Sequence, residues 1–495
     1  MGGSDAYGYV NQAYDWAERA LPRPIPVSEV LPFELSDRMQ APLGYREGPQ
    51  PRTMVPTYAP GLPLMMAAAL TSGPCGPFLV VPVFAALFVW FTFQLGTRAA
   101  GRVIGLVAAL VLSVSPVVLY QAVWPMSDVP AGAIWTGAAV FALGAHRRDA
   151  VTAGILTAIG LLIRPNLLPA ALLLALPLLS TGSHRERLVR MAAFGAPIVP
   201  VAALVGWLNA LWFGSPLNSG YGAAGELYQW TNVLPNLKLY GEWMWRAQTP
   251  WMLLAVVPLA PRFRRFMDPR AIGLCVLLFV AVTAAYLSYA QFEVWWYLRF
   301  LLPAFGALAV LVAAGLGAAS RALPRPFGHV GAALVLWLLA TSSLSFAGRE
   351  GVFGRVRDSE GRYAVIGSFA ATSLPEGAAL IAVQHSGSLR FHTGRPAVRF
   401  AVLEYPRSLE LAPALERAGR HPFLVIDDAE TADVRRRFGI PSGAPLPWPI
   451  RARMRELGGV TVYDLATSVA GGAPIALEPA SAAWCDVPRR VPPRR

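Results

Sequence analysis

Four ionisable side chains stand out in this sequence because they lie beside apolar segments. Asp5 precedes the first apolar run, Asp128 begins another, and Arg164 and Arg299 interrupt sequence that is otherwise apolar. Glu293 lies shortly before Arg299. Charged groups at such positions are costly unless they are solvated or paired, so each is a candidate functional residue.

Together these residue types suit one kind of reaction. A carboxylate can take the proton of an acceptor hydroxyl group while that oxygen attacks a sugar carbon. Arginine side chains can stabilise a leaving phosphate through charge-assisted, often bidentate hydrogen bonds. We therefore assign Asp5 and Asp128 as candidate catalytic residues, and Arg164 and Arg299 as candidate ligands of a donor phosphate.

Each assignment has an ordinary alternative. Residues 1–12 can be a solvated, frayed N-terminus. Asp128 can be a helix N-cap, since Asp favours that position. Arg299 follows Trp295 and Trp296, so it can be an anchor at the membrane surface. For Arg164 we favour function, because a helix-breaking proline follows it on the side of the bundle that is poor in arginine.

The composition predicts a polytopic membrane protein. Of 495 residues 55% are hydrophobic and 14% are charged, and the mean hydropathy is +0.45; a soluble protein has about a quarter of its residues charged. The charges concentrate near the C-terminus, where residues 348–495 hold 20 basic and 15 acidic side chains. We expect an outer loop with the first Asp over residues 1–77, a membrane bundle over 78–347 and a soluble domain over 348–495.

The apolar runs predict a mainly α-helical bundle of about ten spans. A further run ending at Leu70 is too short to cross a bilayer and is expected to lie at its surface. The ten expected spans are 78–97, 102–120, 128–145, 150–164, 166–180, 189–213, 249–261, 271–290, 299–319 and 328–347.

Arginine placement predicts the orientation of this bundle. Alternate loops share a high density of basic residues, which face the cytoplasm by the positive-inside rule. The N-terminal loop, the four candidate residues and the C-terminal domain then share the outer face. The basic residues are Arg98, Arg102, Arg147, Arg148, Arg185, Arg187, Arg190, Arg262, Arg264, Arg265, Arg270, Arg321 and Arg325.

The C-terminal part predicts a small extracytoplasmic α/β domain, because short apolar strands alternate with helical segments. The expected strands are Ala379–Val383, Phe423–Ile426 and Val460–Tyr463, and the expected helices are Arg362–Ser373, Ser408–Ala418 and Thr431–Phe438.

The net charge of +13 does not indicate nucleic-acid binding. All basic residues but Lys238 are arginine, and many lie in short loops between apolar runs. This pattern is typical of membrane topology and of contact with anionic lipid headgroups. We expect membrane lipids as partners and no nucleic acid.

Several short motifs resemble those of one enzyme family when taken in order along residues 2–347. The motifs are Gly3-Ser4-Asp5-Ala6-Tyr7-Gly8-Tyr9, Tyr58-Ala59-Pro60-Gly61-Leu62-Pro63, Leu112-Ser113-Val114-Ser115-Pro116, Pro125-Met126-Ser127-Asp128-Val129-Pro130, Ile163-Arg164-Pro165-Asn166 and Trp295-Trp296-Tyr297-Leu298-Arg299-Phe300-Leu301-Leu302-Pro303. The chain resembles polytopic membrane glycosyltransferases of the GT-C type, close to the family 39-like bacterial relatives of protein mannosyltransferases and lipid A aminoarabinose transferases.

The resemblance implies transfer of a sugar from a polyprenyl-phosphate donor to a lipid, glycan or protein acceptor of the cell envelope. It places the protein in the bacterial inner (plasma) membrane with the active site on the periplasmic side. By position Asp5 matches the catalytic aspartate of the first loop, Asp128 the acidic residue of the second, and Arg164 the phosphate-binding basic residue. Candidate pocket residues are Tyr7, Tyr9, Tyr58, Glu293 and Trp296.

The chain departs from the family pattern in two ways, and each difference leads to an expectation. Many relatives have a second acid beside the first-loop Asp, whereas Ser4 and Ala6 flank Asp5 here, so we expect no metal and no other cofactor. We also expect an inverting reaction. Relatives also have a membrane helix before that Asp. We expect the natural start to lie upstream and to encode such a helix, which the upstream genomic sequence can test.

Functions of other classes remain open at this point. The main alternative is a polytopic transporter or flippase for a lipid or small solute, in which broken helices and interior arginines also occur. A second is an inactive scaffold whose C-terminal domain binds envelope partners. The outer-loop aromatic residues Tyr221, Tyr228 and Trp230 can line an acceptor site or anchor the loop at the membrane surface, and we favour anchoring.

Overall fold

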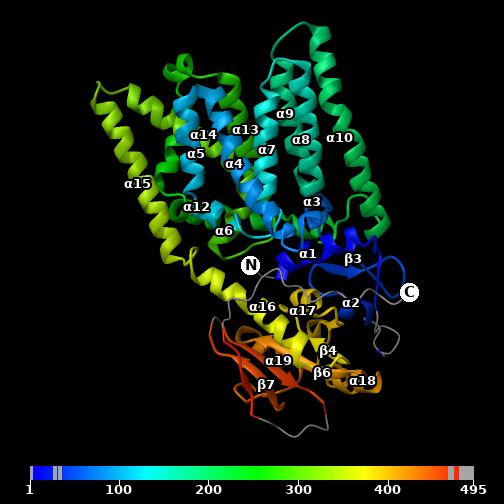
Figure 1. Ribbon diagram of the computed structural model, residues 1–495. Coiled ribbons are helices and arrows are strands. Elements are labelled where there is room, and N and C mark those ends of the chain that lie inside the picture. The colour runs from blue at the N-terminus through cyan, green and yellow to red at the C-terminus, as the bar shows by residue number, and fades with distance from the viewer. Residues whose placement is uncertain (1–3, 26–30, 32–35, 457, 467–472, 479–495) are drawn as a thin grey trace.

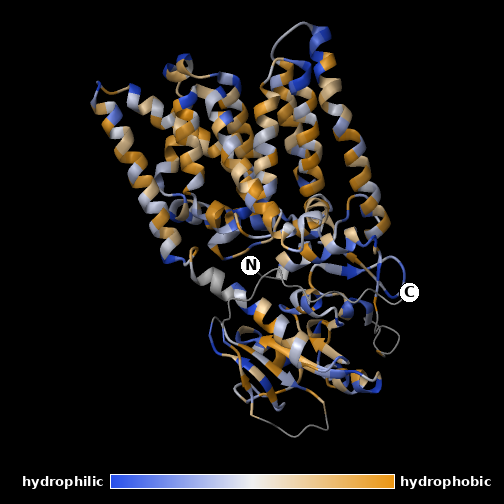
Figure 2. Ribbon diagram, in the orientation of Figure 1, coloured by the Kyte–Doolittle hydropathy of each residue, from blue (hydrophilic) through white to orange (hydrophobic). Residues whose placement is uncertain are grey.

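A helical bundle forms one end of the molecule and an α/β domain the other, with the N-terminal segment between them (Figure 1). The computed structural model describes residues 4–25, 31, 36–456, 458–466 and 473–478. Hydrophobic residues cover the bundle helices, and hydrophilic residues gather at the loops of the end far from the α/β domain (Figure 2).

The N-terminal segment folds on the end of the bundle that faces the α/β domain. Strand β3 is the centre of a small antiparallel sheet, with β1 on one side and β2 on the other. The elements are α1 (Ser4–Ala17), β1 (Arg23–Pro24), α2 (Ser36–Gln40), β2 (Tyr45–Glu47), β3 (Thr53–Pro56) and α3 (Gly61–Ala69).

The bundle contains α-helices and 3-10 helices (η) that follow one another through short loops. Proline and glycine residues break it into pieces; Pro116, for example, begins α6 directly after α5. The helices are η1 (Leu70–Ser72), α4 (Gly76–Ala100), α5 (Arg102–Ser113), α6 (Pro116–Gln121), α7 (Asp128–Ala142), α8 (Arg147–Ile163), η2 (Pro165–Leu167), α9 (Leu168–Leu179), α10 (His184–Phe213), α11 (Ala224–Leu227), η3 (Trp230–Asn232), α12 (Val233–Ala247), η4 (Pro250–Leu259), η5 (Pro261–Phe266), α13 (Pro269–Leu287), η6 (Trp295–Leu301), α14 (Leu302–Arg321) and α15 (Phe327–Arg349).

A helical element overlaps each of the ten ranges that the sequence predicts as spans. Within the described residues, five helices are long and apolar enough to cross a membrane: Gly76–Ala100, His184–Phe213, Pro269–Leu287, Trp295–Arg321 and Phe327–Arg349. Shorter apolar helices include Arg102–Ser113 and Pro250–Leu259. Because the others fall short of the length that a straight crossing needs, the count of ten stays a prediction.

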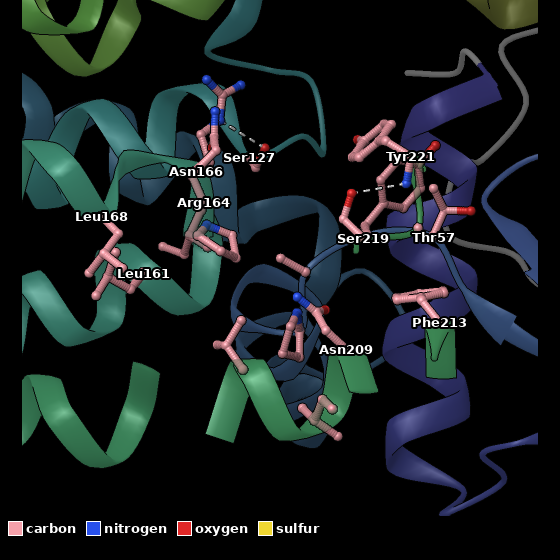
Figure 3. Close-up of a pocket in the computed structure, with 18 of the residues that line it drawn as sticks. Thr57, Ser127, Leu161, Arg164, Asn166, Leu168, Asn209, Phe213, Ser219 and Tyr221 are labelled. Atoms are coloured by element: carbon pink, nitrogen blue, oxygen red, sulfur yellow. Dashed lines mark hydrogen bonds between the residues drawn. The ribbon is translucent and has the colours of Figure 1, made fainter. Parts of the chain in front are cut away.

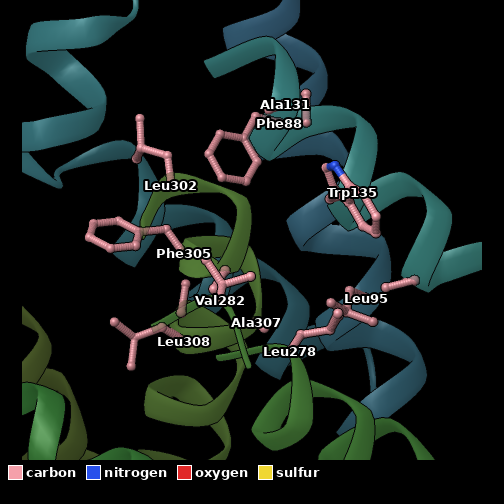
Figure 4. Close-up of a cluster of buried hydrophobic side chains, with 14 of the residues drawn as sticks. Phe88, Leu95, Ala131, Trp135, Leu278, Val282, Leu302, Phe305, Ala307 and Leu308 are labelled. Carbon is pink, nitrogen blue, oxygen red and sulfur yellow. The ribbon is translucent and has the colours of Figure 1, made fainter. Parts of the chain in front are cut away.

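Helix α14 is the centre of the bundle, and almost its whole length is buried. It packs against α4, α5, α7, α13 and η4. Small residues let neighbouring backbones approach it closely: a Cβ at Gly315 would overlap the carbonyl oxygen of Leu254. Larger side chains fill the remaining space, and Phe88, Trp135 and Phe305 belong to one buried cluster (Figure 4). This packing fixes the ends of the helices that carry the candidate site.

The C-terminal domain has a mixed six-stranded sheet with helices on both faces. The strand order is β5-β4-β6-β8-β7-β9, parallel between β4 and its two neighbours and antiparallel across β6-β8-β7. Alternate residues of β6 face two separate cores, Phe423 toward α16 and α17 and Leu424 toward α18 and α19. The elements are α16 (Arg355–Ser373), β4 (Ala378–Ile381), α17 (Ser386–Thr393), β5 (Ala397–Val398), α18 (Leu411–Arg417), β6 (His421–Asp427), α19 (Thr431–Arg437), β7 (Ile450–Met454), β8 (Val460–Asp464) and β9 (Ile475–Ala476).

The predicted elements of this domain are present. Strands β4, β6 and β8 and helices α16, α18 and α19 lie where the sequence predicted short apolar strands and helical segments in alternation. Strands β5, β7 and β9 and helix α17 were not predicted from the sequence. Strands β5 and β9 have two residues each, and β7 carries Arg451 and Arg453, so none shows an apolar run.

Candidate active site

A helical hairpin brings Asp128 and Arg164 together. Asp128 lies in the first turn of α7, where the helix dipole favours a negative charge, and Arg164 ends α8, where it favours a positive one. Because α7 and α8 are joined by a short loop and pack side by side, these two ends lie at the same level. The guanidinium group of Arg164 donates to Oδ1 of Asp128 in a buried ion pair.

Further hydrogen bonds fix the plane of the Arg164 guanidinium group. Its Nε donates to Ser127 Oγ at 3.4 Å, and one terminal nitrogen donates to the Tyr286 hydroxyl at 3.2 Å. Asn166 donates to the same hydroxyl at 2.9 Å and to the Tyr228 hydroxyl at 3.0 Å. The α8–α9 turn is therefore fastened to α13 through Tyr286, which orients the guanidinium group.

A second pair forms around Asp5 in the first turn of α1. The Tyr58 hydroxyl donates to Asp5 Oδ1 at 3.0 Å, and Arg299 donates to Asp5 Oδ2 at 3.3 Å. Arg299 also donates to Met126 Sδ at 3.2 Å, just before Asp128 in the chain. Both Asp5 and Asp128 act electrostatically on Arg299, so the two ion pairs form one neutral cluster.

The two carboxylates differ in their access to solvent. The side chain of Asp128 is 2% exposed and its Oδ1 is held by Arg164. The side chain of Asp5 is 47% exposed although both of its oxygens have partners. A substrate hydroxyl group can therefore reach Asp5, whereas Asp128 is placed to hold Arg164.

Two glycines set the distance between α1 and the Tyr58 ring. A Cβ at Gly8 of α1 would overlap Cε2 of Tyr58 and would stand 2.9 Å from the Cα of Gly44. Gly44 itself has φ +93°, a conformation that other residues rarely adopt. Only with glycine at both positions does α1 approach closely enough for Asp5 to accept the Tyr58 hydrogen bond.

Tyr9 and Tyr58 lie beside the charged cluster and also line a cavity. Their rings stack at 4.1 Å between centroids, and the Tyr9 hydroxyl donates to Ser127 Oγ at 3.0 Å. Burial raises the pKa of Tyr9 to about 12. Burial and the negative charge of Asp5 raise the pKa of Tyr58 well above its usual value, so both hydroxyls stay protonated as hydrogen-bond donors.

A cavity of about 510 Å³ opens beside this cluster (Figure 3). Arg164, Ser127 and Asn166 line one side of it, and Asn209 and Phe213 of α10 line another. The α10 wall is mostly apolar and includes Ala202, Val205, Gly206, Leu208 and Trp212. The cavity thus offers one guanidinium group at the end of an apolar chamber, which suits a phosphate attached to a hydrocarbon chain.

The structure brings six of the predicted site residues together and places the other three elsewhere. Asp5, Asp128, Arg164 and Arg299 meet in one cluster, and Tyr9 and Tyr58 line the cavity. Tyr7 faces away from the cavity, with its hydroxyl 2.9 Å from His392 Nε2 in α17. Glu293 is exposed on a loop, and Trp296 stacks on Tyr120 with 5.7 Å between ring centroids.

Other residues of the site were not predicted from the sequence. Tyr286 lies inside the apolar run of α13, so nothing in the sequence distinguishes it from a core residue. Ser127 and Asn166 stand next to assigned residues, and that adjacency was the available signal. Of the three outer-loop aromatic residues, Tyr221 and Tyr228 line the cavity. Trp230 does not line it and is 90% exposed.

The described residues contain no group of three or more His, Cys, Asp or Glu side chains that could hold a metal ion. Around Asp5 the partners are a tyrosine hydroxyl and a guanidinium group. The positive charge of the cluster comes from Arg164 and Arg299.

Comparison with solved structures relates the whole chain to membrane glycosyltransferases, although no family model and no curated protein sequence matches it. ArnT from Cupriavidus metallidurans bound to undecaprenyl phosphate superposes with a TM-score of 0.56 at 15% identity, covering 96% of this chain and 95% of that one. The oligosaccharyltransferase AglB from Archaeoglobus fulgidus, in complex with an inhibitory peptide and a dolichol-phosphate, gives 0.51 at 11% identity, covering 95% and 71%.

A third similar structure is the arabinofuranosyltransferase AftD from Mycobacteria, with a TM-score of 0.53 at 14% identity, covering 96% of this chain and 40% of that one. All three are GT-C glycosyltransferases. The chain therefore has the fold of these enzymes, and the resemblance inferred from its motifs is confirmed at the level of the fold.

Proposed function

We propose that this chain is a membrane glycosyltransferase that moves a sugar from a polyprenyl-phosphate donor to a hydroxyl group of a cell-envelope acceptor. The observation that carries the proposal is that an accessible carboxylate, Asp5, and a buried guanidinium group, Arg164, belong to one charged cluster beside an apolar cavity. The lipid phosphates named in the ArnT and AglB structures support a donor of this class.

Asp5 acts as the general base. Its carboxylate accepts the proton of the acceptor hydroxyl group as that oxygen forms a bond to the anomeric carbon of the donor sugar. The hydrogen bonds from Tyr58 and Arg299 hold the carboxylate in place. The bond between the anomeric carbon and the phosphate oxygen breaks in the same step, and the electron pair leaves with the polyprenyl phosphate.

Arg164 and Arg299 stabilise the negative charge that develops on the leaving phosphate. Guanidinium groups suit this role because their planar donors match phosphate oxygens in pairs. The partners of Arg164 fix its orientation before the donor binds, which lowers the cost of reorganisation in the reaction. The apolar α10 wall accommodates the first part of the polyprenyl chain.

A single displacement of this kind inverts the configuration at the anomeric carbon. We propose an inverting reaction without a metal ion, because the two arginines supply the positive charge that a metal would otherwise provide. The site then faces the periplasm, and Tyr221 and Tyr228 form part of the substrate wall.

The test uses purified full-length chain in lipid nanodiscs with labelled polyprenyl-phosphate sugars and a cell-envelope extract as acceptor. We expect wild-type protein to transfer label and to release polyprenyl phosphate, and Asp5→Asn to lower kcat by about 10²- to 10⁴-fold. Glu47→Gln is the matched control, since Glu47 is an exposed carboxylate of the same segment; it should keep wild-type activity.

Two results would count against the proposal. Equal turnover by wild type and Asp5→Asn would remove Asp5 as the base. Movement of unmodified donor across a vesicle membrane, without transfer by any variant, would favour the transporter instead.

A further inference from the structure

A polar groove lies on the side of the bundle away from the candidate active site. Helix α15 and the cavity helix α10 stand on opposite sides of the bundle in Figure 1. The groove, of about 340 Å³, runs between α15 and the junction of α12 with η4, and it shares no lining residue with the catalytic cavity. Its lining residues are Trp245, Arg246, Thr249, Pro250, Trp251, Thr341, Ser342, Ser345 and Arg349.

One wall of the groove is a hydroxyl-rich stretch on an apolar span. Helix α15 exposes Leu334 and Trp337 on its surface, as a lipid-facing helix does. In its last turns Ser342 and Ser345 are exposed and face the groove, and Arg349 ends the helix. Among the described residues the side chain of Arg349 has neither a hydrogen-bond nor an ion-pair partner. Polar groups on a lipid-facing surface are costly unless something satisfies them.

The opposite wall presents a buried hydroxyl group and a second arginine. Thr249 is 4% exposed, and its Oγ1 has no hydrogen-bond partner among the described residues. Arg246 pairs with Glu242 at 3.0 Å, but both side chains are about half exposed. Such a surface pair contributes little, so the guanidinium group of Arg246 can turn to a stronger acceptor.

The polar groove continues into an apolar one along η4. Pro250 and Trp251 line both, and Leu253 and Leu254 complete the second, which has a volume of about 410 Å³. From Thr249 the chain runs along η4 toward the arginine-rich end, so the apolar part lies deeper in the bundle than the arginines. The order from the end of α15 inward is therefore guanidinium groups, hydroxyl groups and hydrocarbon surface.

We propose that this groove binds one anionic phospholipid of the surrounding bilayer. Its phosphate lies between Arg349 and Arg246, and its glycerol and ester oxygens accept from Thr249, Ser342 and Ser345. One acyl chain covers Trp251 and Leu254. A phosphate pairs with guanidinium groups in bidentate fashion, and the bound lipid satisfies polar groups that otherwise face hydrocarbon. The lipid joins α15, which leads directly into the C-terminal domain, to the rest of the bundle.

The experiment compares phosphatidylglycerol with phosphatidylcholine on purified full-length chain, with bound lipid measured by native mass spectrometry after stepwise removal of detergent. We expect wild type to retain phosphatidylglycerol in preference to phosphatidylcholine, and Arg246→Gln/Arg349→Gln to lose this preference. Arg262→Gln/Arg325→Gln is the matched control, since it removes two arginines from the far end of the bundle, and it should retain the lipid.

A second variant keeps the charges and fills the hydroxyl-lined part of the groove. Ser342→Leu/Ser345→Leu suits a lipid-facing helix and should also lose the lipid. The proposal is overturned if the arginine variant retains phosphatidylglycerol as wild type does, or if glycerol phosphate without acyl chains competes as well as the whole lipid. Displacement by equimolar polyprenyl phosphate would assign the groove to the donor and would also overturn it.

Discussion

At the scale of single residues, the two carboxylates of the site have different environments and so different expected roles. Asp5 is half exposed and reachable by substrate, whereas Asp128 is buried with Arg164. A buried ion pair that loses one partner leaves an uncompensated charge, which costs more than the pair itself contributes. Substitutions at the two positions should therefore affect different measurements.

We predict that Asp128→Asn destabilises the protein by about 3–5 kcal/mol and raises the KM for the donor, because the guanidinium group of Arg164 loses its buried partner. Asp5→Asn should lower kcat with little change in stability. Thermal unfolding in detergent and donor titration separate the two effects. If Asp128→Asn unfolds at the wild-type temperature and binds donor normally, Asp128 does not hold Arg164.

Gly8 gives a second prediction at this scale. A Cβ there overlaps the Tyr58 ring and the Gly44 backbone, so Gly8→Ala must move α1 or the ring and stretch the hydrogen bond to Asp5. We expect a loss of about 1–3 kcal/mol in stability together with a lower kcat. Gly273→Ala is the control, because a Cβ at Gly273 in α13 meets nothing within 4 Å. Similar behaviour of the two variants would contradict the packing argument.

At the scale of elements, α1 has two faces with two tasks. On one face, Asp5 accepts from Arg299 within the charged cluster, and Tyr9 donates to Ser127 beside it. On the opposite face, Tyr7 bonds to His392 and Asn11 Nδ2 donates to the Gly387 carbonyl at 2.8 Å, both in α17. The C-terminal domain thus holds the helix that carries the proposed base, which a separate, loosely tethered domain could not do.

The interface between α1 and this domain contains two ionisable side chains, His392 and Glu360, whose pKa values change in opposite directions. Burial lowers the pKa of His392 from 6.5 to about 4. Burial raises the pKa of Glu360 in α16 from 4.5 to about 7. Between about pH 4 and 6.5 the unfolded chain binds the extra proton at His392, so that group stabilises the fold as pH rises. Between about pH 4.5 and 7 the folded chain binds it at Glu360, so that group destabilises the fold as pH rises.

In the wild-type protein these two dependences of stability on pH oppose each other. We therefore predict that a substitution at His392 or at Glu360 removes one of them and reveals the other. Relative to wild type, His392→Gln should gain stability as pH falls from 6.5 to 4, and Glu360→Gln should lose stability as pH falls from 7 to 4.5. Denaturant unfolding at a series of pH values measures both differences. Variants whose stability runs parallel to that of wild type across this range would show that neither group titrates on unfolding.

At the scale of the whole molecule, sequence patterns predicted the features that depend on neighbouring residues, such as the positions and the order of helices and strands. Helix order alone places Asp128 and Arg164 at one end of a hairpin, and short apolar runs located β4, β6 and β8. The pattern could not find Tyr286, which lies 122 positions from its partner Arg164 in an apolar run. Nor could it show that Tyr7 faces α17, because that contact joins residues 385 positions apart. Long-range polar contacts leave no periodic trace in a sequence.

The orientation of the molecule in the membrane gives the last prediction. The arginine-rich loops lie at the end opposite the α/β domain, so the positive-inside rule predicts that the charged cluster and that domain lie outside the cytoplasm. We expect an epitope inserted after Gly443, an exposed glycine of the domain, to be cleaved by protease added to intact spheroplasts. An epitope in the loop of residues 322–326 between α14 and α15 should be protected until the membrane is permeabilised. The reverse pattern would put the site on the cytoplasmic face and would require a donor that is loaded there.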